Sequence, residues 1–296
     1  MAGLLDRLVG GEILVSDGAM GTMLFERGLK TGECPERWNL ERPEVLEEIA
    51  RLYVQAGSDI VQTNTFGGSP LKLAQYALED KTEAINSAAV RAVRKVVDDR
   101  VYVSASCGPC GRLLKPYGDT NPEEVAESFE RQLKAVAAEG VDLICIETMT
   151  DLTEATIAIK AARTAAPDTP IAATMTFDAT PRGFFTIMGV SVRQAVEGLA
   201  EAGADIVGSN CGNGIENMIL IAREFKQHSS VPIIIQSNAG LPEMKDGALV
   251  YPETPEFMAE KCRELVDMGV SIIGGCCGTT PEHIRAMKAM INERGE

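Results

Sequence analysis

Short runs of apolar residues recur along the chain, and each run ends in a polar residue, a glycine or a cysteine. Most of the runs are rich in valine and isoleucine and do not alternate between apolar and polar positions. Such continuous runs are typical of parallel strands that are buried on both faces. We therefore predict eight strands, at Ile13–Asp17, Ser58–Thr65, Val101–Cys107, Asp142–Thr148, Ile171–Phe177, Asp205–Cys211, Val231–Ser237 and Val270–Cys276.

A longer stretch with helical periodicity follows each predicted strand. Thr254 and Thr280 each precede a proline, which places a capping hydroxyl before the first helical turn. Several stretches end at a glycine such as Gly57 or Gly203, as a left-handed helix cap requires. The predicted helices are Pro43–Ala56, Ser69–Val97, Pro122–Glu139, Asp151–Ala165, Val192–Ala202, Ile215–Gln227, Thr254–Met268 and Pro281–Glu293.

Eight strand–helix units in one chain predict an α/β protein with a (β/α)₈ TIM barrel, formed as a single domain over residues 1–296. A doubly wound open sheet is the competing fold. The number of units favours the barrel, and so does the position of the chemistry at the strand ends. The segment Gly21–Asn39 is expected to be a longer loop after the first strand, on the active-site face.

The charge of the chain narrows the range of partners. Asp and Glu total 43 against 28 Lys and Arg, which gives a formal net charge of −15. This balance argues against nucleic acid and against an anionic membrane surface, because both require clustered Lys and Arg. The sequence has no apolar run of the roughly 18 residues that a spanning helix needs, and its start lacks a secretory apolar region. We expect a cytoplasmic protein whose eight cysteines are reduced.

The predicted strand ends carry carboxylates, amides and thiols, for which a hydrophobic core has no use. In a barrel these ends and the loops after them build the active site. In chain order the segments are Asp17–Thr22, Thr63–Gly67, Cys107–Pro109, Glu147–Thr148, Thr176–Phe177, Asn210–Gly212, Gln236–Asn238 and Gly274–Gly278.

Cys276 and Cys277 are adjacent and lie between glycines, at a strand end where both side chains can face one cation. Cys211 ends the sixth predicted strand and could add a third thiolate across the barrel mouth. Three thiolates with one exchangeable position would suit a catalytic Zn²⁺ ion, one per chain. The alternative is that all three are small buried core residues, since free cysteine is commonly buried.

Such a metal site would favour thiol chemistry. Three thiolates leave Zn²⁺ a poor electrophile towards a carbonyl, but the ion can still bind a substrate thiol as thiolate and release its proton. Asp17 and Glu147 lie at strand ends, where either could hold an ammonium group, and the backbone of Gly18–Gly21 could hold a carboxylate. The alternative for Asp17 is a turn or helix cap. Together these groups would accommodate an amino-acid thiol, and they indicate alkyl transfer to it.

The segments DGAMGT from Asp17, TNTF from Thr63, NCG from Asn210 and GGCCGTTP from Gly274 resemble the zinc-dependent homocysteine S-methyltransferases. The similarity is greatest to the homocysteine-binding domain of cobalamin-dependent methionine synthase, and it runs over nearly the whole chain. The resemblance implies a (β/α)₈ barrel that methylates homocysteine to form methionine. It also assigns the site residues: zinc ligands Cys211, Cys276 and Cys277, amino-group ligands Asp17 and Glu147, carboxylate contacts Gly18 and Ala19, and a substrate-side position for Asn64.

The sequence leaves the identity of the methyl donor open. Methionine synthase continues into folate and cobalamin modules, whereas the sequence here ends at Glu296, so we expect this chain to bind no cobalamin itself. The resemblance favours a separate methyl-corrinoid protein as donor. The alternatives are S-methylmethionine, S-adenosylmethionine or a betaine-like onium compound, for which Trp38, Phe66 and Phe177 are the candidate cage residues. Another thiol or selenol could replace homocysteine, and a non-enzymatic zinc or corrinoid-protein scaffold is a further alternative.

The sequence Cys107-Gly-Pro-Cys110 copies a thioredoxin-type dithiol. A redox dithiol normally lies at a helix N-terminus in a smaller fold, whereas this pair follows a strand of a barrel-length chain. We therefore expect no redox role for it. His228 and His283 lie in predicted helices and are expected to be structural.

Overall fold

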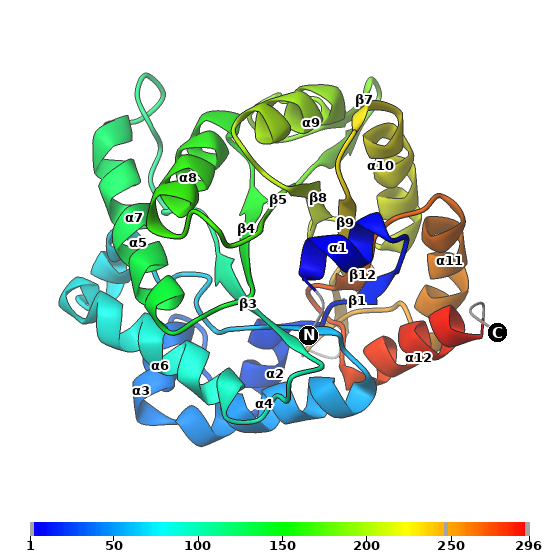
Figure 1. Cartoon of the computed structure of the whole chain (residues 1–296), viewed down its shortest axis with the longest axis horizontal. Helices are drawn as coiled ribbons and strands as arrows, with labels where there is room; N and C mark the ends of the chain where they lie inside the picture. Colours follow the sequence, from blue (N-terminus) through cyan, green and yellow to red (C-terminus); the bar gives the residue numbers. More distant parts are fainter. Residues whose placement is uncertain (1–2, 246–247, 294–296) are drawn as a thin grey trace.

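The computed structural model describes residues 3–245 and 248–293, and eight parallel strands form its centre (Figure 1). The order of neighbours is β1, β12, β9, β8, β5, β4, β3 and β2. A parallel bridge between Ser16 and Ile60 joins the two ends of this order and closes the barrel. The (β/α)₈ prediction is therefore confirmed over a doubly wound open sheet. The strands are β1 Leu14–Val15, β2 Ile60–Gln62, β3 Tyr102–Cys107, β4 Leu143–Met149, β5 Ile171–Met175, β8 Ile206–Asn210, β9 Ile233–Ser237 and β12 Ile272–Gly275.

An outer ring of helices surrounds the strands (Figure 1). Their apolar faces pack on the outer face of the barrel, because the parallel strands are buried on both sides. Gly57, Gly140, Gly203 and Gly269 all have positive φ angles, as expected of glycines that end helices before the next strand. The main helices are α4 Pro43–Ala56, α6 Thr82–Arg94, α7 Pro122–Ala138, α8 Leu152–Ala165, α9 Val192–Glu201, α10 Ile215–His228, α11 Pro255–Asp267 and α12 Pro281–Asn292.

Two sequence predictions need correction. The continuous helix predicted over Ser69–Val97 is interrupted, because Ala77 adopts a left-handed conformation with φ of 55° that no helix can contain. The predicted loop Gly21–Asn39 is largely helical instead. The first segment contains α5 Pro70–Leu73, η2 Ala74–Tyr76 and η3 Glu79–Lys81 before α6, and the second contains most of α2 Met20–Glu26, then η1 Pro35–Arg37 and the start of α3 Trp38–Glu41.

A short helix, α1 Leu4–Val9, lies across the amino-terminal end of the barrel (Figure 1). Its residues Leu4 and Leu8 pack into a buried cluster with the first residues of the strands, among them Leu14, Ile60 and Ile272. This cluster forms the floor of the barrel, so the opposite end is the one that presents the loops after the strands.

Two hairpins extend those loops. One follows β5 and consists of β6 Asp178–Thr180 and β7 Gly183–Phe185, and the other follows β9 and consists of β10 Glu243–Lys245 and β11 Ala248–Val250. Both lie at the carboxyl end of the strands, where a barrel builds its site. Among the described residues, no helix has the length and apolar character to cross a membrane.

Candidate functional site

The three predicted cysteines meet at the carboxyl end of the barrel. Cys211 directly follows β8, and Cys276 and Cys277 directly follow β12. Their sulfur atoms all lie within 4.8 Å of one another, and Cys211 Sγ lies 3.8 Å from Cys277 Sγ. Within the described part of the chain, this is the only group of three or more Cys, His, Asp or Glu side chains close enough to share a metal ion.

The electrostatics of the cluster favour one thiolate at Cys211. Hydrogen bonds from the thiols of Cys276 and Cys277 lower the pKa of Cys211, and the Asn238 side chain adds a further hydrogen bond. The hydrogen bonds that Cys276 and Cys277 make to Cys211 raise the pKa of both of these thiols. Cys211 has a φ of 60°, a strained value for a residue that is not glycine. Strained backbone of this kind concentrates at functional sites.

Two further residues lie around the cluster: Asn238, from a strand-end segment predicted at the barrel mouth, and Tyr251, which was not predicted. The Oδ1 atom of Asn238 is buried and has no hydrogen-bond partner. Tyr251 hydrogen-bonds to Cys277, and burial raises the pKa of Tyr251 to about 12. A side chain at Gly278 would collide with the Tyr251 ring, so the ring lies directly on the turn after the cysteines. No local sequence pattern marks the hydrogen bonds from Asn238 to Cys211 and from Tyr251 to Cys277, because each bond joins two segments that are far apart in the sequence.

Asp17 and Glu147 lie below the cysteines in the barrel interior, with exposed fractions of 1% and 7%. Burial raises the pKa of Asp17 to about 7, and the charge of Glu147 adds to this. Burial likewise raises the pKa of Glu147 to about 7, and the charge of Cys211 adds to it. These interactions place the two predicted carboxylates near each other and near the cluster. Buried carboxylates without a cationic partner are a recurrent mark of functional sites.

Gln62 and Ser106 hold the two carboxylates. The backbone N–H of Gln62 donates to Asp17 Oδ2 over 2.8 Å, and the Gln62 side chain hydrogen-bonds Glu147. The Ser106 hydroxyl donates a short hydrogen bond to Glu147 Oε1. Neither residue was predicted as part of the site, because each is a polar residue inside an ordinary strand.

The Gly18–Ala19 segment joins β1 to α2 beside these groups. The Ala19 N–H donates to Thr279 Oγ1 over 3.2 Å, and the Tyr53 hydroxyl donates to Ala19 O over 3.1 Å. A Cβ atom at Gly18 would lie 2.7 Å from Thr279 Oγ1 and 2.9 Å from the Tyr53 hydroxyl. Glycine is therefore required at this position by the close approach of two side chains.

Asn64 has a structural role in this geometry. Its Nδ2 donates to Pro35 O over 2.9 Å and to Asn39 Oδ1 over 2.8 Å. The amide thereby ties the loop after β2 to the η1–α3 segment. Its contact with a substrate stays a prediction.

Several other predicted candidates are part of the protein framework. Cys107 and Cys110 are buried free thiols, and burial raises the pKa of both. The His283 ring accepts from or donates to Thr280 at the start of α12, as predicted for a structural histidine. Of the candidate onium cage, Trp38 is covered by the Arg42 guanidinium at 4.3 Å, and Phe177 is fully buried. Phe66 is exposed, but because Trp38 and Phe177 are covered, the three residues together do not form an open cage.

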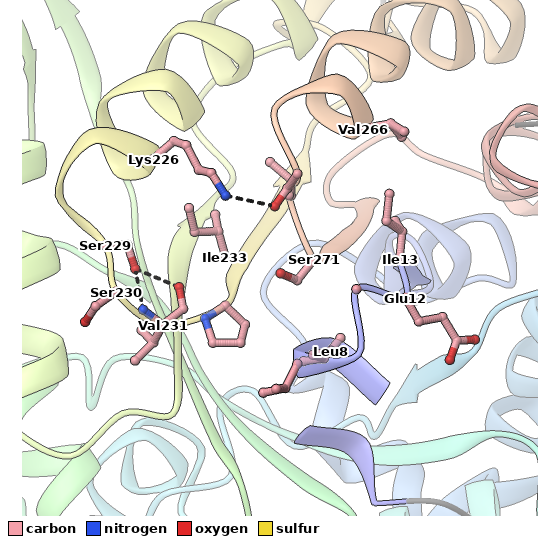
Figure 2. A pocket seen from close by; sticks show the side chains of 15 residues that line it. Leu8, Glu12, Ile13, Lys226, Ser229, Ser230, Val231, Ile233, Val266 and Ser271 are labelled. Atoms are coloured by element: carbon pink, nitrogen blue, oxygen red, sulfur yellow. Dashed lines mark hydrogen bonds between the residues drawn. The ribbon is translucent and has the colours of Figure 1, made fainter. Parts of the chain in front are cut away.

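A cavity of about 470 Å³ lies elsewhere in the barrel (Figure 2). Its walls come from α1 and from the turns that precede β1, β9 and β12, including Leu8, Lys226 and Ser271. It therefore opens at the amino-terminal end of the barrel, opposite the cysteines. The candidate site is identified by its converging chemistry, not by the size of an open cavity.

Comparisons with known proteins identify the family of the chain. The family described as homocysteine S-methyltransferase matches residues 14–291. The chain is 32% identical over 297 residues to methionine synthase of Mycobacterium leprae, and the aligned region covers 95% of this chain and 24% of that protein. It is also 32% identical over 305 residues to methionine synthase of Mycobacterium tuberculosis, and the aligned region covers 97% of this chain and 25% of that protein. The chain thus spans about a quarter of the length of these relatives.

Among solved structures, the metallated form of the homocysteine methyltransferase MmuM from Escherichia coli has the same fold. The TM-score is 0.78 at 24% identity, and the match covers 97% of this chain and 99% of the other. This structural similarity supports the barrel fold, and the sequence matches identify the family. The chain belongs to the homocysteine S-methyltransferase family of methyltransferase enzymes.

Proposed function

We propose that this barrel transfers a methyl group to the thiol of homocysteine and forms methionine, with one Zn²⁺ ion held by Cys211, Cys276 and Cys277. The observation that carries the proposal is the meeting of three thiols with two buried carboxylates in one barrel mouth. An amino acid with a thiol has complementary groups for both parts of this site.

The residues present fit zinc. Tetrahedral sites with cysteine ligands suit this ion, and a catalytic site keeps one position open for substrate. The buried Oδ1 atom of Asn238, beside the cluster, has no hydrogen-bond partner. A bound ion would satisfy this oxygen. When bound, zinc would hold the substrate sulfur as a thiolate at neutral pH.

The protein's own groups position the amino acid. Asp17 and Glu147 bind the substrate ammonium, which supplies the positive charge that these buried carboxylates otherwise lack. The backbone of the Gly18–Ala19 segment receives the substrate carboxylate, through N–H groups other than that of Ala19, which donates to Thr279 Oγ1. In support, α2 begins at Met20 with no side-chain cap, so its first N–H groups are not occupied by a capping side chain.

Methyl transfer then needs alignment. The substrate sulfur attacks the methyl carbon in line, the new S–C bond forms, and the electron pair of the broken bond leaves with the donor. The rigid strand ends that hold the ammonium fix the direction of the sulfur, and such alignment can supply several kcal/mol of a barrier. No general base would be required, because zinc at Cys211, Cys276 and Cys277 would already favour the ionised form of the sulfur.

The proposed donor is a methyl-corrinoid protein separate from this barrel. Two relatives that cover the chain are named methionine synthases, and the strand-end motifs resemble the cobalamin-dependent kind. The lack of an open aromatic cage among Trp38, Phe66 and Phe177 is consistent with this choice over an onium donor. S-methylmethionine, S-adenosylmethionine and a betaine are the alternatives that the assay below includes.

The test combines metal content with turnover. Purified protein is analysed for zinc, and methionine formation from homocysteine is measured with a methyl-corrinoid protein and with each small donor. We expect one zinc per chain and turnover with the corrinoid protein. Cys211→Ser removes one ligand and should abolish both zinc retention and activity.

Cys34→Ser is the matched control. Cys34 is a buried thiol outside the cluster that donates to Glu36 Oε2 over 3.3 Å, and a serine hydroxyl can make the same bond. Full activity in Cys211→Ser would contradict the mechanism. Turnover of another thiol or a selenol in preference to homocysteine would redefine the acceptor, and zinc without turnover of any thiol would favour a scaffold.

A further inference from the structure

The side chain of Asn210 joins three parts of the barrel interior. Asn210 is the last residue of β8, immediately before Cys211, and its exposed fraction is 1%. Its Oδ1 accepts from the Thr148 N–H over 2.8 Å and from the Thr174 hydroxyl over 2.7 Å. Its Nδ2 donates to Thr148 Oγ1 over 2.7 Å and to Cys276 Sγ over 4.0 Å.

These four contacts use the full hydrogen-bonding capacity of a primary amide, which has two donor hydrogens and two acceptor positions. An aspartate in its place keeps the acceptors but loses both donors. A glutamine has the same groups but is one methylene longer. The environment of position 210 is therefore specific for asparagine.

The contacts link two places where the backbone departs from regular structure. β4 shifts its register against β5 between Ile146 and Met149, the stretch that contains Glu147. Within this stretch Thr148 has a φ of 61°, and Cys211 on the other side of Asn210 has a φ of 60°. Both are unfavourable for residues other than glycine and persist only when the surroundings fix them.

We propose that Asn210 is a positioning residue that sets the distance between the cysteine cluster and Glu147. This inference rests on the proposed function, because it assigns the two ends of the substrate to the two ends of the Asn210 network. At one end the amide orients Cys276, and at the other it holds Thr148 and the bulge that presents Glu147.

The spacing that Asn210 fixes determines which amino-acid thiol fits. Cysteine has the same ammonium and carboxylate as homocysteine but one methylene less between them and the sulfur. If the distance between the cysteine cluster and Glu147 is rigid and matched to homocysteine, cysteine is too short to contact both. A loosened spacing reduces this difference, so loss of the Asn210 network should lower selectivity more than it lowers metal binding.

The test uses the zinc-loaded chain of residues 1–296 and needs no methyl donor. Binding of homocysteine and of cysteine is measured by calorimetry in wild type and Asn210→Asp, with Co²⁺-substituted protein as a spectroscopic monitor of Cys276. One methylene is worth about 10–200-fold in a fitted pocket, so wild type should prefer homocysteine by about tenfold or more. In Asn210→Asp, homocysteine should bind about tenfold more weakly and the preference should fall below about threefold.

Asn86→Asp is the matched control. Asn86 is also a fully buried amide whose Nδ2 makes two hydrogen bonds, to Gly68 O over 2.8 Å and to Thr82 O over 2.7 Å. This variant should lose comparable unfolding free energy and keep the wild-type preference and Co²⁺ spectrum. If Asn210→Asp does not fold, Thr148→Ala removes one acceptor of the network and should shift the preference in the same direction by a smaller factor.

Two results would overturn the inference in different ways. If wild type binds homocysteine selectively and Asn210→Asp does so equally, with an unchanged Co²⁺ spectrum, the positioning role is wrong and the proposed function stands. If zinc-loaded wild type binds neither thiol, the proposed function fails and the positioning role fails with it.

Discussion

Gln62 bridges the two buried carboxylates of the candidate site: its backbone N–H donates to Asp17 Oδ2 over 2.8 Å, and its side chain hydrogen-bonds Glu147. These neutral donors hold the carboxylates in place without neutralising them. Burial therefore dominates and raises the pKa of each carboxyl to about 7. The charge of both groups then depends on pH in the physiological range, and two predictions follow from that dependence.

Ligand binding should strengthen as pH rises through 7. The substrate ammonium requires ionised carboxylates, and both are increasingly protonated below their pKa of about 7. Methionine is the suitable ligand, because it has the ammonium and carboxylate but no ionisable thiol. Calorimetry should find tighter binding at pH 8 than at pH 6, and Glu147→Gln should bind more weakly with a flatter profile. Equal wild-type affinity at both pH values would exclude Asp17 and Glu147 as the ammonium ligands.

The stability of the ligand-free protein should change in the opposite sense. A carboxyl whose folded pKa lies above its unfolded value near 4 favours folding most at low pH, and this contribution is lost as pH rises through 7. Asp17→Asn should therefore gain roughly 2–4 kcal/mol in unfolding free energy relative to wild type between pH 5 and pH 8. Urea denaturation of both proteins at pH 5 and pH 8 measures this difference in unfolding free energy.

The exposed Asp178 provides the control for that experiment. Asp178→Asn should change the unfolding free energy by less than about 0.5 kcal/mol at either pH, as surface substitutions usually do. A wild-type stability that follows Asp17→Asn in parallel across this range would show that Asp17 does not titrate near 7.

Gly18 and Gly21 should respond differently to alanine. A Cβ at Gly18 meets Thr279 and Tyr53, whereas a Cβ at Gly21, inside α2, meets no atom within 4 Å. Gly18→Ala should destabilise the protein by about 1–3 kcal/mol through overpacking and weaken methionine binding. Gly21→Ala should be neutral or slightly stabilising, because alanine is the better helix former. Thermal unfolding and calorimetry of the two variants test this contrast, and equal behaviour would contradict it.

The Cys107 and Cys110 thiols should resist modification in the folded protein. Both are buried, and burial raises the pKa of Cys107 well above its usual value and that of Cys110 to about 12. A thiol reagent at pH 8 should therefore label them only after denaturation, as mass spectrometry of the digested protein can establish. The double variant Cys107→Ser, Cys110→Ser should keep zinc content and turnover. Loss of turnover without loss of folding would reopen a redox role.

The barrel was predictable from the sequence because each strand is a buried apolar run that carries its own signal. Ile171–Met175 and Ile233–Ser237 lie within the predicted limits of their strands. The cysteines were predictable as a cluster because parallel strands all present their ends at one face. The interruption before α6 was not predictable in this way, since Ala77 is a good helix former and its left-handed φ reflects tertiary packing.

The contacts that support the site were also missed, for a related reason. Asn210 and Gln62 are ordinary polar residues of their strands, and their partners lie on other segments of the barrel. Asn210 was noted only as part of a motif, whereas its four hydrogen bonds join β4, β5 and the turn after β12. A linear pattern reports which residues reach the barrel mouth, but it does not report which atoms they bind there.

The α1 helix has a consequence for the order of events. Because Leu4 and Leu8 close the floor of the barrel, the proposed function requires amino acid, methyl donor and product to share the mouth as their route. The carboxylates lie deeper than the cysteines, which are partly exposed. Under the proposed function, the amino acid would therefore enter with its ammonium first and its sulfur facing outward, and the methyl donor would bind after it.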